Sequence, residues 1–273
     1  MKALNQLKTF QRILGEYPAD VPLGKFLPGF YRQNKQMGST DRRVASRLVY
    51  NYFRLGKALS NLVTDERLLV AEFLCNTQVN SFLQHFKPDW AACVGFTINE
   101  KIALVKATYP DFKITDVFPW SAELSKDIDQ QQFLRSFFVQ PDLYIRMIKG
   151  FEHQVKAELN KAGIVFKDEG NNCLCLPNGT RLENIFPNQH WFEVQDFSSQ
   201  QTAQFFKPEK WDKWWDACAA SGGKSLLLHD QQPDIKLVVS DIRESILANL
   251  DERFRQAGLM KYQKKILDLT QDP

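Results

Sequence analysis

A short run of small residues near the end of the sequence has the composition of a ligand-binding loop. Residues 218–224 read Cys-Ala-Ala-Ser-Gly-Gly-Lys and follow a segment, 213–217, that predicts a β-strand. Small side chains allow the backbone to approach a ligand closely, and the helix predicted after the loop would present free N–H groups at its N-terminus. Because ligands of open α/β sheets bind at the carboxyl ends of the strands, we expect a site here.

An aspartate lies at the end of each of the three strands predicted in this region. These strands cover 213–217, 236–240 and 265–268, and the aspartates are Asp216, Asp241 and Asp268. An acidic residue after the second strand, here Asp241, is the expected acceptor for the two ribose hydroxyls of a bound nucleoside. The alternative is an α/β domain in which these carboxylates only cap helices.

The loop fits neither of two common nucleotide-binding motifs. A P-loop requires a glycine five residues before its final Gly-Lys-Ser, and that position is Cys218. A dinucleotide fingerprint requires three glycines at G-x-G-x-x-G spacing, which Ala220, Gly222 and Lys224 do not supply. The loop therefore predicts a nucleoside pocket without a phosphate cradle, which suits a cofactor such as S-adenosylmethionine.

The elements that must position this loop alternate between strands and helices. A short helix follows the loop, and an amphipathic helix over 242–257, closed by Gly258, separates the second and third strands. Alternation of this kind favours a parallel sheet with helices on its faces. We therefore expect residues 193–273 to form a Rossmann-like α/β arrangement.

The preceding segment, residues 131–192, predicts a small α+β module. A strand is expected at 143–147, a helix over 151–161, and two short strands at 164–166 and 173–176. This order of elements does not continue a helical bundle and instead indicates a separate mixed sheet with a helix.

Residues 1–130 predict an all-α domain, because apolar residues recur at steps of three and four between Pro and Gly breaks. The clearest helix begins at an N-cap cluster, Ser39-Thr40-Asp41. One face of it carries a stripe of basic and aromatic residues: Arg43, Arg47, Tyr50 and Arg54. The stripe could be a solvated face with arginine stems lying over apolar surface. Alternatively, it could be a surface that binds RNA phosphates and bases. From residue types alone the solvated face is favoured.

Composition excludes several classes of protein. Hydrophobic residues make up 44% and charged residues 25%, which is ordinary globular composition, and no apolar run reaches the length of a membrane span. The N-terminal residues do not form a signal peptide, and the five cysteines are an odd, scattered set, so a reducing cytoplasmic setting is expected. A net charge of +3 is compatible with a polyanionic partner without requiring one. No metal site is expected, since Cys173 and Cys175 are spaced for packing on one strand face.

The loop also carries a family resemblance. Residues 218–224 resemble the cofactor-binding motif C-A-A-P-G-G-K of the Sun/Fmu family of RNA cytosine-5 methyltransferases, with Ser221 in place of proline. Residues 194–200, Val-Gln-Asp-Phe-Ser-Ser-Gln, resemble the V-Q-D-x-S-S-Q segment that precedes that motif. The family's N-terminal domain, which is similar to the antitermination factor NusB, would cover residues 1–130, where a D-R-R…L-V-Y pattern matches. Residues 131–192 would be its RNA-recognition-like module, and residues 193–273 would be the first half of its Rossmann-like methyltransferase domain, which is therefore incomplete.

The resemblance implies a function and a set of site residues. It implies methyl transfer from S-adenosylmethionine to C5 of a cytosine in RNA, with ribosomal RNA the favoured substrate. The cofactor would be held by Asp241 at the ribose, by Asp268 near the adenine amino group, and by the loop around its methionine and ribose portions. The loop residues concerned are Cys218, Ala219, Ala220, Ser221, Gly222, Gly223 and Lys224.

The catalytic cysteines that the resemblance implies are not found. C5 methylation requires a thiolate that adds at C6 of the cytosine, and the family carries it and a second cysteine in Pro-Cys and Thr-Cys dipeptides after the fourth and fifth strands. Neither dipeptide occurs in these 273 residues. We therefore expect the chain to be the front part of a longer enzyme and inactive alone, with no catalytic residue assigned. Two alternatives stay open: Cys218 as the nucleophile, and a non-catalytic RNA-binding or regulatory protein that retains the fold.

Overall fold

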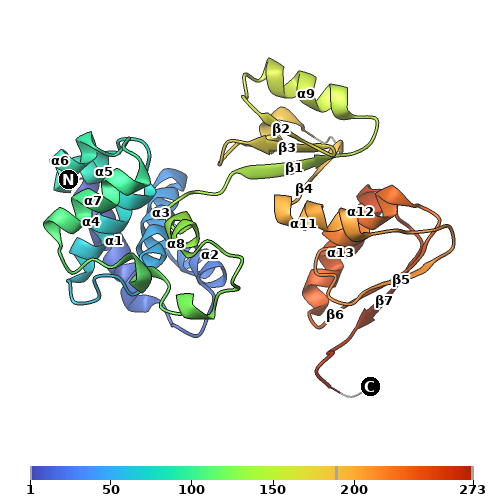
Figure 1. Cartoon of the computed structure of the whole chain (residues 1–273), viewed down its shortest axis with the longest axis horizontal. Coiled ribbons are helices and arrows are strands. Elements are labelled where there is room, and N and C mark those ends of the chain that lie inside the picture. The colour runs from blue at the N-terminus through green and yellow to red at the C-terminus, as the bar shows by residue number, and fades with distance from the viewer. Residues whose placement is uncertain (1, 188–189, 272–273) are drawn as a thin grey trace. The chain divides into compact units, whose positions relative to one another are not determined.

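The computed structural model describes residues 2–187 and 190–271. It divides into two compact units, Met1–Gln140 and Pro141–Pro273, and both are shown in Figure 1. Within the described residues, no helix is both long and apolar enough to cross a membrane.

The first unit is built from helices. They are α1 (Lys2–Glu16), α2 (Leu23–Gln33), α3 (Ser39–Arg54), α4 (Thr64–Cys75), α5 (Ser81–Phe86), α6 (Pro88–Ala92), α7 (Ile98–Thr108) and α8 (Gln130–Ser136), with 3-10 turns η1 (Ile114–Val117) and η2 (Ser121–Glu123).

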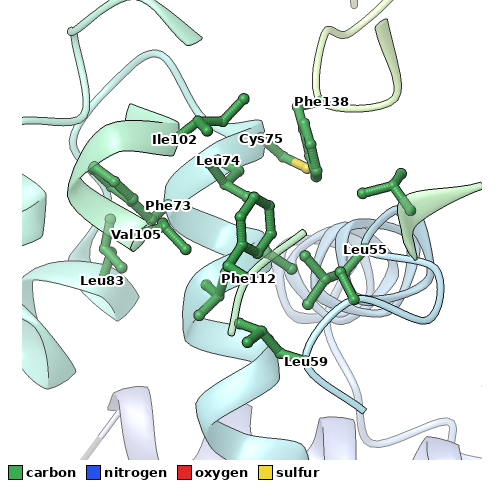
Figure 2. Close-up of a cluster of buried hydrophobic side chains, with 14 of the residues drawn as sticks. Leu55, Leu59, Phe73, Leu74, Cys75, Leu83, Ile102, Val105, Phe112 and Phe138 are labelled. Atoms are coloured by element: carbon green, nitrogen blue, oxygen red, sulfur yellow. The ribbon is translucent and has the colours of Figure 1, made fainter. Parts of the chain in front are cut away.

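The central helix of this unit is α4. Every residue from Leu68 to Cys75 is buried, as expected for a helix surrounded by neighbours on all sides. Figure 2 shows Phe73 and Leu74 of α4 among side chains from other helices and loops, including Val105 and Phe112. The all-α character predicted for this part of the chain is therefore present.

Helix α3 begins at Ser39, as predicted, but its cap differs from the prediction. The N-cap is Gly38 in an extended conformation, and no side chain of the Ser39-Thr40-Asp41 cluster makes a capping hydrogen bond. The cluster lies one residue further into the helix. Asp41, in the first turn, instead places a negative charge near the positive end of the helix dipole.

The compact unit extends past residue 130 and includes α8. The side chain of Phe138 is buried in its core. The guanidinium of Arg54 donates hydrogen bonds to the carbonyl oxygens of Phe137 and Val139, both at 3.0 Å. These contacts hold the segment after α8 against α3.

The second unit begins with a four-stranded antiparallel sheet. Its elements are β1 (Leu143–Met147), α9 (Glu152–Lys161), β2 (Lys167–Gly170), β3 (Cys173–Leu176), α10 (Leu182–Ile185) and β4 (Phe192–Val194). The strand order β2-β3-β1-β4 gives a split β-α-β arrangement. Helix α9 lies against one face of this sheet (Figure 1) through Val155 and Leu159.

The strand predicted at 164–166 is wrong. Gly163 has φ +69° and ends α9, and the amide of Ile164 donates to the carbonyl of Leu159 at 2.9 Å, which is the closing bond of a Schellman motif. The amide of Ile164 is therefore engaged in ending the helix and is not available for pairing with another strand. The strand starts only at Lys167.

A three-stranded parallel sheet follows in the same unit, after α11 (Phe197–Gln201) and η3 (Thr202–Phe205). Its elements are β5 (Lys213–Asp216), α12 (Gly223–Gln231), β6 (Lys236–Asp241), α13 (Glu244–Gln256) and β7 (Tyr262–Ile266), in the order β5-β6-β7. Buried residues of α12, β6 and α13 form its core, among them Leu226, Val239 and Leu250.

The third strand lies earlier than predicted. The sequence predicts 265–268, but β7 runs from Tyr262 to Ile266 and pairs in parallel with β6 from Leu237 to Asp241. Most of β7 is exposed. The strand is therefore determined by its hydrogen bonding with β6, and burial of apolar side chains contributes little to it.

Candidate functional site

The glycine-bearing loop joins the carboxyl end of β5 to the N-terminus of α12, as the sequence predicts. Gly222 adopts the left-handed conformation, with φ +82°. A side chain at this position would run into the ring of Phe254 and come within 3.1 Å of the Leu250 Cγ, so both the backbone angle and the packing against α13 require glycine. Ala220 is also left-handed, at φ +47°, which is uncommon for a residue with a side chain.

The loop is tied to the end of β6 by three hydrogen bonds. The amide of Ala219 donates to the carbonyl of Ser240 at 2.9 Å, and the Ser240 hydroxyl donates to the carbonyl of Ala217 at 3.1 Å. The amide of Ala220 donates to Oδ2 of Asp241 at 2.9 Å. The structure therefore brings the predicted loop and the predicted ribose acceptor into direct contact.

Asp241 is 5% exposed, and its carboxylate is fully engaged within the protein. Oδ1 accepts hydrogen bonds from the amide and the Nε of Arg243 at 3.0 and 3.1 Å. Oδ2 accepts from Ala220 and, at 3.4 Å, from the Arg243 guanidinium. The Arg243 side chain lowers the pKa of Asp241, against the opposing effect of burial, so the carboxylate stays ionised at neutral pH.

The other two strand-end aspartates have local partners. Asp216 accepts a hydrogen bond from the hydroxyl of Ser225 at 2.7 Å, which fixes the first turn of α12 to the end of β5. Asp268 is partly exposed and accepts from the amide and hydroxyl of Thr270 at 2.9 and 2.7 Å. It lies on the same sheet edge as Asp241, whose register partner is Ile266.

Arg253 of α13 is a site residue that the sequence analysis missed. Its Nη1 donates to the carbonyl oxygen of Ser221 at 2.9 Å and to the Ser221 hydroxyl at 2.8 Å. Its Nη2 pairs with Glu193 of β4. Ser221, which stands where the family motif has proline, is thus held by a side chain contact that proline could not accept. The motif around Ser221 does not indicate that its partner is an arginine about three turns into α13.

Removing the Arg253 side chain should loosen the loop. We expect Arg253→Ala to weaken cofactor binding by about three- to tenfold, because the variant loses only the ordering of the loop and not a direct contact with the cofactor; a factor of ten is about 1.4 kcal/mol. Ser221→Ala should have a smaller effect, since the carbonyl of residue 221 still accepts from Arg253. Calorimetric titration with S-adenosylhomocysteine measures both. Arg255→Ala, an exposed arginine two positions along α13, is the control; equal losses in Arg253→Ala and Arg255→Ala would refute a specific role for Arg253.

Gln195 links the small sheet to the glycine-bearing loop. Its Nε2 donates to the hydroxyl of Ser199 at 3.2 Å and to the carbonyl of Gly223 at 3.3 Å, and its Oε1 accepts from Nε of Arg146 at 3.1 Å. Arg146 in turn pairs with Asp230 of α12. The V-Q-D-x-S-S-Q segment therefore has a structural role that its sequence alone did not reveal.

The predicted RNA-binding stripe on α3 separates into two kinds of residue. The side chain of Arg47 is 31% exposed and lies 3.0 Å from the buried carboxylate of Glu72, and Arg54 is engaged by carbonyl oxygens after α8. Arg43 and Tyr50 are exposed, Tyr50 at 45%. Only these two are presented to solvent as the prediction requires.

Among the five cysteines, only Cys218 is exposed. Burial raises the pKa of the Cys75 thiol to about 12 and that of Cys173 to about 11, so both stay protonated at neutral pH. Within residues 2–187 and 190–271, no group of three or more His, Cys, Asp or Glu side chains is arranged to hold a metal ion.

Comparison with known proteins finds bacterial relatives. The chain is 32% identical over 130 residues to ribosomal RNA small subunit methyltransferase B of Proteus mirabilis, covering 44% of this chain and 30% of that protein. It is 25% identical over 138 residues to the protein of the same name from Klebsiella pneumoniae, covering 47% and 31%. The chain is a homologue of these methyltransferases. The resemblance to the Sun/Fmu family is thereby confirmed.

The extent of the match is partial. The chain spans less than a third of the length of these two methyltransferase B relatives. No protein-family model matches the sequence. The structure is similar to the crystal structure of PH0851, with a TM-score of 0.53, 14% sequence identity, and coverage of 87% of this chain and 63% of that chain. At this identity the likeness concerns the fold.

Proposed function

We propose that this chain supplies the cofactor loop and RNA-binding parts of an S-adenosylmethionine-dependent enzyme that methylates C5 of a cytosine in RNA, with ribosomal RNA as the substrate. The observation that carries the proposal is the contact between the loop and Asp241, where the Ala220 amide lies 2.9 Å from the carboxylate at the end of the adjacent parallel strand. The names of the methyltransferase B relatives support the choice of ribosomal RNA.

The residues present fit the cofactor. Residues 218–224 would surround its methionine and ribose portions, and Asp268 would accept from the adenine amino group. An ionised carboxylate with two oxygens suits two ribose hydroxyls. Asp241 offers such a group once the Arg243 side chain, which is 56% exposed, turns away from Oδ1. The bound cofactor supplies an electrophilic methyl group on its sulfonium.

The chain's own residues position the cofactor. Asp241 holds the loop through Ala220 and would accept the ribose hydroxyls. Arg253 holds Ser221, and Gln195 holds the carbonyl of Gly223. Because the contacts of Ala220, Ser221 and Gly223 form without a ligand, the loop is preorganised and little of the binding free energy is lost in ordering it.

The Arg243 guanidinium should compete with the ribose for Asp241. We expect Arg243→Ala to bind S-adenosylhomocysteine up to about fivefold more tightly, because the Arg243 side chain is 56% exposed and an ion pair screened by solvent contributes about 0–1 kcal/mol. Calorimetry on the wild type and on the Arg255→Ala control gives the reference. Weaker binding by Arg243→Ala would show that the arginine contacts the cofactor. Absence of any binding in the wild type would refute the proposed function and favour a non-catalytic RNA-binding protein.

The exposed pair on α3 should contribute to RNA affinity. We expect Arg43→Ala to weaken binding of ribosomal RNA fragments and to reduce the slope of log K against log salt by about one, because one phosphate contact is lost. Tyr50→Ala should lower affinity without changing the slope, since stacking releases no counterions. Lys106→Ala, an exposed lysine on α7, is the control. If Arg43→Ala behaves like Lys106→Ala, the stripe is solvated surface.

A further inference from the structure

The small antiparallel sheet of the second unit has two faces with different partners. Ile145 and Leu174 lie on the face that α9 covers. Side chains alternate along a strand, so Arg146 and its register partners, Cys173 on β3 and Glu193 on β4, lie on the other face. This second face therefore carries two residues of opposite charge on neighbouring strands, and each side chain pairs with a helix of the parallel sheet.

Glu193 acts on the glycine-bearing loop through one intermediate side chain. Its carboxylate pairs with Nη2 of Arg253 on α13, and the two side chains are 17% and 25% exposed. The Nη1 of the same guanidinium donates to the carbonyl oxygen and the hydroxyl of Ser221 at 2.9 and 2.8 Å. A guanidinium is planar and rigid, so the carboxylate that holds one nitrogen also fixes the direction of the other.

Gln195, two residues after Glu193, contacts the end of the loop. Its Nε2 lies 3.3 Å from the carbonyl oxygen of Gly223. A Cβ on Gly223 would lie 3.5 Å from this nitrogen and 4.0 Å from Nη1 of Arg253. The two side chains therefore lie against the loop at the same place, where it enters α12.

Arg146 fixes Gln195 from the side of the small sheet. Both residues are buried, and Nε of Arg146 donates to Oε1 of Gln195 at 3.1 Å. The same guanidinium pairs with Asp230 near the end of α12. Next to it on β1, the ring of Tyr144 stacks on that of Phe197 in α11, with the centroids 5.4 Å apart. The small sheet is thus joined to α11 and α12 by contacts that do not involve the loop.

The loop is consequently held from two directions. Residues 219 and 220 are bound by the end of β6, within the parallel sheet. Ser221 and Gly223 are bound by side chains whose own partners belong to the small sheet. The conformation of residues 221–223 therefore depends on a part of the chain outside the parallel sheet.

We propose that Glu193 and Gln195 are positioning residues for the cofactor, and that the small sheet acts through them as a clamp on residues 221–223. Glu193 acts through Arg253, and Gln195 acts directly on the carbonyl of Gly223. The inference rests on the proposed function for the identity of the ligand, whereas the clamp is a property of the free protein. A change at β4 should therefore alter both the loop and the affinity for the cofactor.

The first measurement is calorimetric titration of the complete 273-residue chain with S-adenosylhomocysteine. Glu193→Ala should bind about two- to fivefold more weakly, the scale of a partly exposed ion pair. Glu193→Gln, which keeps an oxygen for the guanidinium, should lie between Glu193→Ala and the wild type. The double variant Glu193→Ala/Arg253→Ala should bind as weakly as Arg253→Ala alone, because Glu193 acts only through Arg253. Glu183→Ala, an exposed glutamate on α10 of the same module, is the control and should match the wild type.

Gln195→Glu tests the second contact. The variant has nearly the same shape and keeps the acceptor for Arg146, but it replaces the donor that faces the Gly223 carbonyl with a second oxygen. We expect it to bind S-adenosylhomocysteine about three- to tenfold more weakly. Affinity equal to that of the wild type would remove Gln195 from the clamp.

The second measurement is the ¹H–¹⁵N spectrum of the free protein, which tests the clamp without a ligand. The amide signals of Gly222 and Gly223 should shift in Glu193→Ala and in Arg253→Ala, and stay in place in Glu183→Ala. Unshifted signals or unchanged affinity in Glu193→Ala, or losses that multiply in the double variant, would overturn the clamp while leaving the proposed function standing. Shifted loop signals in a chain that does not bind S-adenosylhomocysteine would support the clamp and refute the proposed function.

Discussion

Methyl transfer to ribosomal RNA is expected to be undetectable when these 273 residues are tested alone. C5 of cytosine is a poor nucleophile until a thiolate adds at C6, and proximity of the reactants does not replace that addition. Cys75 and Cys173 are buried, and their pKa values are raised to about 12 and 11, so neither supplies a thiolate at neutral pH. Cys218 is exposed but lies inside the loop that the cofactor would occupy.

The measurement is transfer of labelled methyl from S-adenosylmethionine to ribosomal RNA. The matched samples are the chain itself and its Cys218→Ala variant, with a Sun/Fmu-family methyltransferase that carries the Pro-Cys and Thr-Cys dipeptides as the positive control. Activity in the control enzyme only is the expected result. Activity in the chain that disappears in Cys218→Ala would make Cys218 the nucleophile and would overturn the assignment of this cysteine to the cofactor loop.

Replacement of Asp241 should have the largest effect on cofactor binding. We expect Asp241→Ala to weaken it by about 1.5–3 kcal/mol, the scale of hydrogen bonds to a charged group, which corresponds to a factor of about 10–150. Two causes act together, because the variant loses the ribose acceptor and also the partner of the Ala220 amide. Asp241→Asn, which keeps one oxygen acceptor, should lie between the wild type and Asp241→Ala.

The loop could be predicted from sequence because local rules decide it. Small residues between a strand and a helix, with a glycine at the one left-handed position that packs on Phe254, leave few other conformations. Asp241 was predictable for the same reason, since the end of the second strand of a parallel sheet lies next to the loop after the first.

Long-range partners could not be predicted in this way. Arg253 and Ser221 are 32 positions apart and Arg146 and Asp230 are 84 apart, so neither pair leaves a periodic signal in the sequence. The ion pair of Arg47 could not be predicted either. Its spacing on α3 suggested an RNA-binding surface, but its side chain pairs with the buried carboxylate of Glu72 on α4, a partner that the pattern of residues on α3 does not reveal.

Two strand predictions were wrong at positions where backbone hydrogen bonds determine the structure. Ile164-Val165-Phe166 has strand composition, yet the amide of Ile164 closes the end of α9. The third parallel strand is set by its register with β6, and its exposed residues give little hydrophobic signal. The residue composition of a segment predicts a strand only when the side chains of that segment are buried.

The central claim is that the loop and Asp241 form an S-adenosylmethionine site, and calorimetric titration with S-adenosylhomocysteine tests it most directly. The samples are the wild type, Asp241→Ala and Asp234→Ala, the last an exposed aspartate before the amino end of β6, on the opposite sheet edge. The account predicts saturable binding by the wild type and by Asp234→Ala, and a loss of about 10–150-fold in Asp241→Ala alone. Equal affinity in all three proteins would contradict it.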